Sequence, residues 1–104
     1  MIYIFASCEL DTNCRELRVG RIPIPVEPQV YDVLVYLIRN RKRVISKDEL
    51  QERFWGSKVV TEGSYMYCIS AARKAIGDNG RSQRFIRTFR GRGYQFIAPV
   101  KEDY

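Results

Sequence analysis

Short runs of β-prone residues occupy the first quarter of the chain, before any apolar spacing that is typical of a helix. The runs are residues 3–7, 16–19 and 21–25. Turn-forming residues separate them, at positions 11–13 and at Gly20. Because Pro23 and Pro25 have no backbone N–H to donate, we expect the third run to lie at the edge of a sheet. The pattern predicts short strands over residues 1–26.

Three helices are predicted from the spacing of the apolar residues and from the residues at the helix ends. We expect them over about residues 28–40, 46–54 and 61–76. Pro28 lies in the first turn of the first helix, where its missing N–H costs little. Ser46 and Glu49 have the spacing of a capping box at the start of the second helix. Thr61 is the expected N-cap of the third helix, and Gly77 ends it.

The third predicted helix has one apolar face and one face of short or polar side chains. At about 100° per residue, Tyr65, Ile69, Ala72 and Ile76 share a narrow arc and should face the core. The opposite face has no acid after Glu62, and its short side chains would let it enter a major groove about 12 Å wide. An ordinary exposed helix face would look the same. The residues on the outer face and its flanks that we consider as DNA contacts are Ser64, Met66, Tyr67, Ser70, Ala71, Arg73 and Lys74.

A basic segment follows the third helix. Residues 84–98 contain two β-prone runs joined by a basic turn, and no acidic residue occurs between positions 79 and 100. Like charges placed this close together repel each other, which favours a polyanion as the partner. The alternative is a solvated basic hairpin with no partner.

Composition narrows the choice of partner. The chain has 104 residues, enough for one domain, and a net charge of +6. This charge favours an anionic partner, either nucleic acid or an acidic membrane surface. No apolar run approaches the roughly 18 residues of a spanning helix, and the N-terminus lacks the charged region of a signal peptide. We therefore expect a domain over residues 1–100, a tail over 101–104 and no membrane segment.

Metal binding and catalysis are not expected. Histidine is absent, and Cys8, Cys14 and Cys68 form no Cys-x-x-Cys pair, so a zinc site within one chain is not predicted. Reduced thiols in a cytoplasmic protein are the favoured interpretation, with a Cys8–Cys14 bridge as the alternative. The usual acid–base and nucleophile combinations are missing, so we expect neither an enzyme nor a cofactor.

Five stretches, in this order and spacing, resemble one family over nearly the whole chain. They are residues 27–34 (EPQVYDVL), 43–50 (RVISKDEL), 54–56 (FWG), 69–78 (ISAARKAIGD) and 86–94 (IRTFRGRGY). The chain is similar to the OmpR/PhoB-type winged helix-turn-helix DNA-binding domain of bacterial transcriptional regulators. The resemblance implies an α+β fold with an N-terminal antiparallel sheet, a three-helix core and a C-terminal β-hairpin, the wing.

The resemblance also implies a function, namely sequence-preferring binding of double-stranded DNA by the effector domain of a transcription regulator. The third helix would enter the major groove. At the wing, Arg90 would reach the minor groove with Arg92 beside it and Arg87 nearby, and Thr88 and Tyr94 would lie near phosphates. In some members the turn at residues 55–60 contacts RNA polymerase, and copies bind in tandem on direct repeats.

The chain departs from the family at the outer face of the third helix. Relatives have several cations there, whereas this sequence has Gly63, Ser70 and Ala71, which leaves Arg73 and Lys74. Sequence preference is then expected to depend more on Tyr67, Met66 and Ser70, or on DNA shape read by the wing.

Two further expectations follow from the departures. If base reading had been lost, the domain would be a winged-helix protein-interaction module with little or no DNA binding, and Met66 and Tyr67 would be its anchors. The chain also begins directly with the strands, with no receiver domain ahead of them and no sensor region after Val100. We expect an excised domain rather than an unusually short regulator.

Overall fold

The N-terminal residues form an antiparallel sheet. The computed structural model describes residues 1–56 and 62–103, and its sheet has the strand order β4-β3-β2-β1-β7. The strands are β1 (Ile2–Phe5), β2 (Cys8–Asp11), β3 (Glu16–Val19), β4 (Ile22–Ile24) and β7 (Lys101–Asp103). The first four strands are sequential neighbours, and β4 lies at the edge, where its proline was predicted to place it. The predicted antiparallel sheet is confirmed.

Two strands differ from the sequence prediction. The segment β2 was not predicted, because Cys8 and Leu10 are its only apolar residues. The C-terminal residues, expected to be a tail, form β7 and pair with β1 from Ile2 opposite Asp103 to Ile4 opposite Lys101. All three β7 residues are exposed, so backbone hydrogen bonding rather than side-chain burial holds this strand. No hydrophobic pattern could reveal it.

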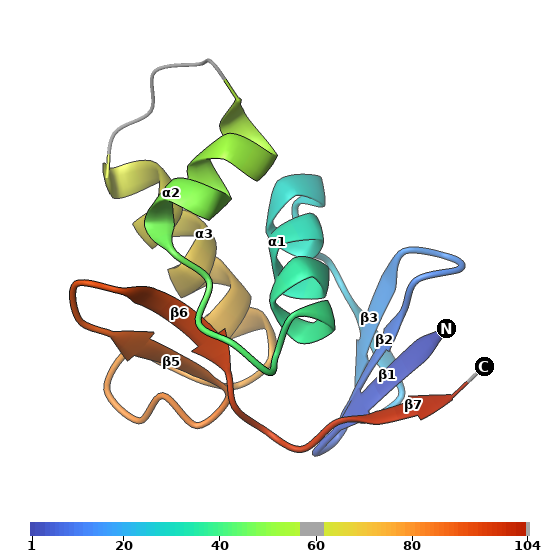
Figure 1. The fold of residues 1–104 in the computed structure, drawn as a ribbon. Helices are drawn as coiled ribbons and strands as arrows, with labels where there is room; N and C mark the ends of the chain where they lie inside the picture. Colours follow the sequence, from blue (N-terminus) through green and yellow to red (C-terminus); the bar gives the residue numbers. More distant parts are fainter. Residues whose placement is uncertain (57–61, 104) are drawn as a thin grey trace.

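Three helical segments pack beside the sheet, α1 (Pro28–Arg39), α2 (Lys47–Leu50) and α3 (Glu62–Ala75). Figure 1 shows α1 between the sheet and the other helices. Seven of the 12 residues of α1 are buried, consistent with contact on two sides. In α3, Ile69 and Ala72 are buried, Ile76 just beyond its end is buried as well, and Tyr65 is half-buried, so the predicted inward face is confirmed.

The second predicted helix is interrupted. After four residues α2 continues as a π-helical segment, η1 (Gln51–Trp55), in which the Gly56 N–H donates to the Gln51 carbonyl at 2.9 Å. The Ser46 hydroxyl accepts from the Glu49 N–H at 3.0 Å, so the predicted cap is present. In a capping box the Glu49 carboxylate would bond back to the cap residue. Here it accepts two hydrogen bonds of 2.7 Å from the Arg43 guanidinium. Thr61, the predicted cap of α3, lies outside the described residues.

The wing consists of β5 (Ile86–Phe89) and β6 (Gly93–Phe96), which pair antiparallel. Its inner face joins the core of the domain. The Phe96 ring lies 5.0 Å from the ring of Phe5 in an edge-to-face arrangement, and the Phe85 ring lies 5.8 Å from Phe5. These aromatic contacts fix the wing against β1. The fold is the predicted winged helix-turn-helix, with a sheet, three helices and a C-terminal hairpin.

Candidate nucleic-acid interface

The outer face of α3 and the wing border the same hollow, of about 480 Å³. Its walls include Met66, Ser70 and Arg73 from α3 and Thr88, Phe89 and Arg90 from the wing, with Lys47 at the start of α2. Two elements separated by a ten-residue loop therefore present one continuous surface. The outer face of α3 and the basic hairpin both contribute to it.

Most residues predicted as contacts are accessible there. Met66 is 56% exposed and Tyr67 is 54% exposed. The other exposed residues are Ser70, Lys74, Arg87, Thr88, Arg90 and Arg92. Ser64 and Ala71 are partly buried on the flank of α3 that faces away from the wing. Two predicted residues, Arg73 and Tyr94, are buried.

Arg73 faces inward, so its predicted place as a cation of the accessible flank of α3 is wrong. Only 8% of the residue is exposed. Its guanidinium donates to the Ile86 carbonyl at 2.9 and 3.1 Å and to the Thr88 hydroxyl at 2.8 Å. Burial lowers the pKa of Arg73, and the nearby Asp78 carboxylate opposes that shift. The side chain connects α3 to β5 because it projects from the flank that faces the hairpin.

Tyr94 is also part of the core rather than of the surface. It is 6% exposed, and its backbone pairs with Ile45, with N···O distances of 2.7 and 2.9 Å. The neighbouring Gly93 makes this pairing possible. Its φ is +144°, and a Cβ atom there would lie 2.0 Å from the Ile45 carbonyl oxygen. Thus β6 approaches the start of α2 more closely than any side chain at position 93 would allow.

Asp78 is the residue of this region that sequence reasoning missed. It is 6% exposed, and its carboxylate accepts backbone N–H bonds from Arg84 (2.8 Å), Phe85 (2.9 Å) and Ile86 (3.1 Å). Burial raises the pKa of Asp78, but these N–H donors outweigh it and hold the pKa at about 2. The available signal was its isolation, because it is the one acid between Glu62 and Glu102. Asp78 fixes the segment that leads into the wing.

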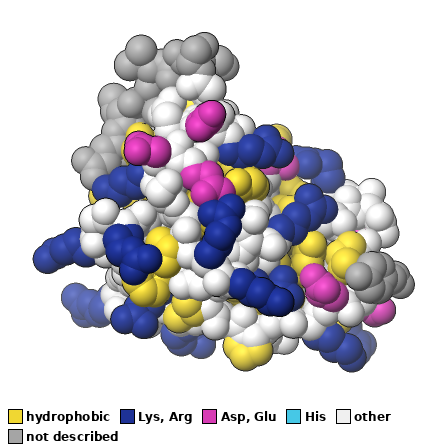
Figure 2. Space-filling view, viewed as in Figure 1, with side chains coloured by type: hydrophobic (Ala, Val, Ile, Leu, Met, Phe, Trp, Pro, Cys, Tyr) yellow, Lys and Arg dark blue, Asp and Glu magenta, His cyan; other side chains and the backbone are white. Residues whose placement is uncertain are grey.

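The charge of the molecule is concentrated around this surface. Residues 63–100 contain seven Lys and Arg residues and one acid, whereas the rest of the chain has eleven cations and eleven acids. Residues 63–100 therefore have the whole net charge of +6. In Figure 2, several Lys and Arg side chains lie at the lower left of the molecule, where Figure 1 places the hairpin, and others lie over its centre and right; the visible acids lie away from the lower left. Such a field attracts polyanions.

One carboxylate does lie beside the outer face of α3. The Tyr67 hydroxyl donates a hydrogen bond to Glu27, which directly precedes α1. This bond raises the pKa of Tyr67. Tyr67 is therefore held at the side of α3 toward α1, and Met66 lies at the side toward the wing.

The remaining predictions concern the turn after the second helix, the cysteines, membrane spans and metal ligands. Beyond Trp55 and Gly56, the turn predicted to contact RNA polymerase lies outside the described residues, so that contact stays a prediction. The three cysteines are free. In the described part of the chain, no helix is long and apolar enough to span a membrane, and no group of three or more potential metal ligands of the His, Cys, Asp or Glu type occurs.

Comparison with known proteins identifies the family. The model of the family "Transcriptional regulatory protein, C terminal" matches residues 21–96. The chain is 35% identical over 77 residues to the transcriptional regulator HilA of Salmonella typhi, covering 74% of this chain and 14% of HilA. The chain thus spans about one-seventh of that relative's length. Because the family model covers most of it, this chain belongs to the family of transcriptional regulatory proteins of the OmpR/PhoB type.

Solved structures give the same result for the fold. The response regulator DrrB of Thermotoga maritima, an OmpR/PhoB homologue, superposes with a TM-score of 0.84 at 27% identity, over 92% of this chain and 44% of DrrB. The DNA-binding domain of Klebsiella pneumoniae RstA, solved in complex with the RstA box, superposes with a TM-score of 0.80 at 26% identity, over 92% of this chain and 96% of that domain. The winged-helix architecture is therefore shared along almost the whole chain.

Proposed function

We propose that this domain binds double-stranded DNA with a sequence preference, as the effector domain of a bacterial transcription regulator. The third helix, α3, enters the major groove, and Arg90 and Arg92 reach the adjacent minor groove. The observation that carries the proposal is the shared hollow, in which the outer face of α3 and the arginine-tipped wing meet. The family and the RstA domain solved with the RstA box support it.

Under this proposal the domain has no catalytic role and acts in the cytoplasm. Tandem binding of a second copy, and contact with RNA polymerase through the turn after Trp55, belong to the same proposal. They rest on the family alone.

The test is a titration at several salt concentrations of a labelled duplex chosen by selection from a random pool. Each neutralised phosphate contributes about −0.9 to the slope of log affinity against log salt, so three to five contacts predict a slope of roughly −3 to −4.5. A flat response would count decisively against DNA binding. Arg90→Ala should weaken binding on selected and unrelated duplexes alike, because a wing arginine at the backbone or minor groove carries little base information.

A second function has one observation in its favour. The two large side chains on the outer face of α3, Met66 and Tyr67, are more than half exposed, as anchors of a protein interface would be. Binding to another protein that is insensitive to salt, with no duplex binding at any salt concentration, would establish that alternative.

A further inference from the structure

The accessible surface of α3 has an unusual composition for a helix that reads bases. Among its described residues 63–75, the exposed ones are Gly63, Met66, Tyr67, Ser70 and Lys74. Bidentate reading of guanine is typical of Arg or Lys, and that of adenine is typical of Asn or Gln; Lys74 is the one residue of these types in that set. The only arginine of the helix is Arg73, whose guanidinium is bound to the wing. Lys74 lies in the last turn, whereas base contacts of such helices come mainly from the N-terminal half.

The two flanks of this face differ in what they could contact. On the side toward α1, the Tyr67 hydroxyl is already bonded to the Glu27 carboxylate, which would repel phosphates. On the side toward the wing, Met66 borders the hollow together with Phe89, which is half-buried, and Ile69, which is 2% exposed. Met66 therefore presents an apolar, unbranched and adaptable side chain to the hollow between α3 and the wing.

The major groove has one apolar group to offer such a side chain. It is the C5-methyl group of thymine, and the other groove edges are hydrogen-bond donors and acceptors. We propose that Met66 is a specificity-determining residue, which packs against thymine methyl groups and makes the domain prefer A·T pairs under the N-terminal half of α3. This inference rests on the proposed DNA binding.

The size of the effect follows from the burial of one methyl group. Removing a buried methyl costs about a fourfold loss of affinity at each contacted position. The effect depends on the methyl group and not on charge, so it should be the same at every salt concentration, whereas the overall affinity is not.

The experiment compares two versions of the selected duplex, one with thymine and one with deoxyuridine, which lacks only the methyl group. We expect about a fourfold weaker complex for each contacted position at which deoxyuridine replaces thymine. In Met66→Ala the two duplexes should bind equally, and Met66→Leu should restore the difference because leucine is again a large apolar side chain. Ser70→Ala and Lys74→Ala, on the same face, should keep the difference.

Each outcome decides a different point. Equal binding of the thymine and deoxyuridine duplexes by the unchanged domain overturns the role of Met66 and leaves DNA binding intact. A thymine preference that survives Met66→Ala also overturns it, and assigns the contact to another residue. If neither duplex is bound at any salt concentration, the proposed function fails, and this inference fails with it. Thermal unfolding of each variant shows that the fold is retained, as expected for an exposed position.

Discussion

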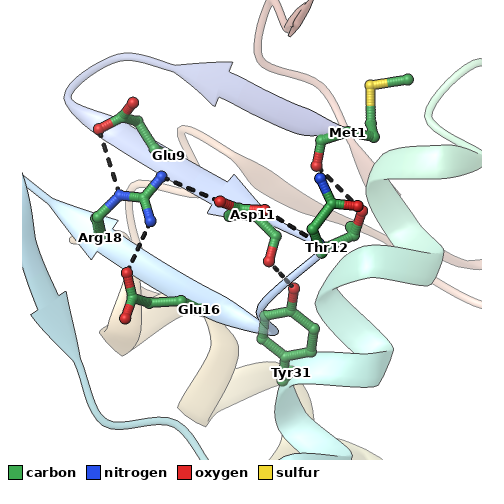
Figure 3. Close-up of polar contacts among 8 residues, drawn as sticks. Met1, Glu9, Asp11, Thr12, Glu16, Arg18 and Tyr31 are labelled. Atoms are coloured by element: carbon green, nitrogen blue, oxygen red, sulfur yellow. Dashed lines mark hydrogen bonds and ion pairs between the residues drawn. The ribbon is translucent and has the colours of Figure 1, made fainter. Parts of the chain in front are cut away.

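Arginine has opposite surroundings at the two ends of the molecule, in the N-terminal sheet and in the wing. In the sheet, Arg18 lies among Glu9, Asp11 and Glu16, with N···O distances of 3.7, 3.6 and 2.7 Å (Figure 3). The hydrogen bond to Glu16 is the main cause of its raised pKa. Three carboxylates surround the charge of Arg18, so this arginine attracts an external anion only weakly.

In the wing the compensation is missing. Within the described part of the chain, neither Arg90 nor Arg92 forms an ion pair, and both are exposed. The one acid of residues 63–100, Asp78, is buried and occupied by backbone N–H groups, and the acid that borders a hollow with Arg92 is Asp48, in α2. The comparison shows that the arginine charge in the sheet is paired with acids, whereas the arginine charges of the wing are unpaired and give that side of the molecule a positive potential.

The largest expected effect comes from removing the buried acid that holds the wing. In Asp78→Ala, three backbone N–H groups lose their acceptor, each worth about 1 kcal/mol or more. We expect the free energy of unfolding, measured in urea, to fall by about 3 kcal/mol. The matched control is Asp103→Ala on exposed β7, which should change stability by less than about 0.5 kcal/mol. Equal effects of the two substitutions would contradict the structural role of Asp78.

The same carboxylate makes stability depend on pH. The pKa of Asp78 is about 2 in the folded domain, below its ordinary value of 3.8. Its contribution, on the order of 2 kcal/mol, is therefore fully present above about pH 4 and is lost as the pH falls through about 2. In Asp78→Asn this loss should be smaller, with a remainder from Glu49, whose pKa is also about 2.

The next effect concerns the inward-facing arginine. In Arg73→Lys the charge is kept, but a point-like ammonium cannot reproduce the guanidinium bonds to Ile86 and Thr88. We expect a loss of about 1–3 kcal/mol in stability. Affinity should fall to a similar extent on all duplexes, as measured by competition with the selected and unrelated sequences. A changed base preference would instead show that Arg73 reads bases directly.

Replacing unpaired and paired arginines by alanine tests the contrast between the two regions. Arg90→Ala together with Arg92→Ala should reduce the salt slope by nearly 2 if each contacts one phosphate, and should weaken binding at least tenfold at low salt. Arg15→Ala removes another exposed arginine, one that is paired with Asp32 at 2.8 Å. It should leave both the slope and the affinity unchanged. Equal reductions of the slope per positive charge removed would mean that net charge, and not its placement, drives binding.

The smallest effect is expected from the carboxylate beside α3. Glu27→Gln removes a negative charge next to the proposed DNA surface and should raise affinity about two- to threefold at low salt. Because the bond to Glu27 raises the pKa of Tyr67, that pKa should also fall in the variant. Glu9→Gln changes the net charge equally but lies in the sheet, so it should have no such effect on affinity.

Local patterns were sufficient to predict where the helices and the hairpin lie, but not the π-helical segment η1 within the second helix. The Ser46 cap, the inward face of α3 at Ile69 and Ala72, and the clustered arginines are all properties of nearby residues. The resemblance to the OmpR/PhoB family supplied their arrangement.

Long-range contacts explain what could not be predicted. The strand β7 exists because its backbone meets β1 nearly one hundred residues away in the sequence. Helical periodicity gives only the direction in which the side chain leaves the helix, and on that basis Arg73 was placed on the accessible flank. Its long side chain bends from that direction toward a carbonyl of β5. The carboxylate of Asp78 is buried only once α3 and the wing have packed together.

The central claim, that α3 and the wing form one DNA-facing surface, can be tested residue by residue in solution. The ¹⁵N-labelled domain would be titrated with the selected duplex while its backbone amide signals are followed by NMR. We predict that the largest changes fall within residues 62–75 and 86–96, with β1 to β4 nearly unaffected. Changes centred on the sheet, with α3 and the wing unaltered, would contradict the claim.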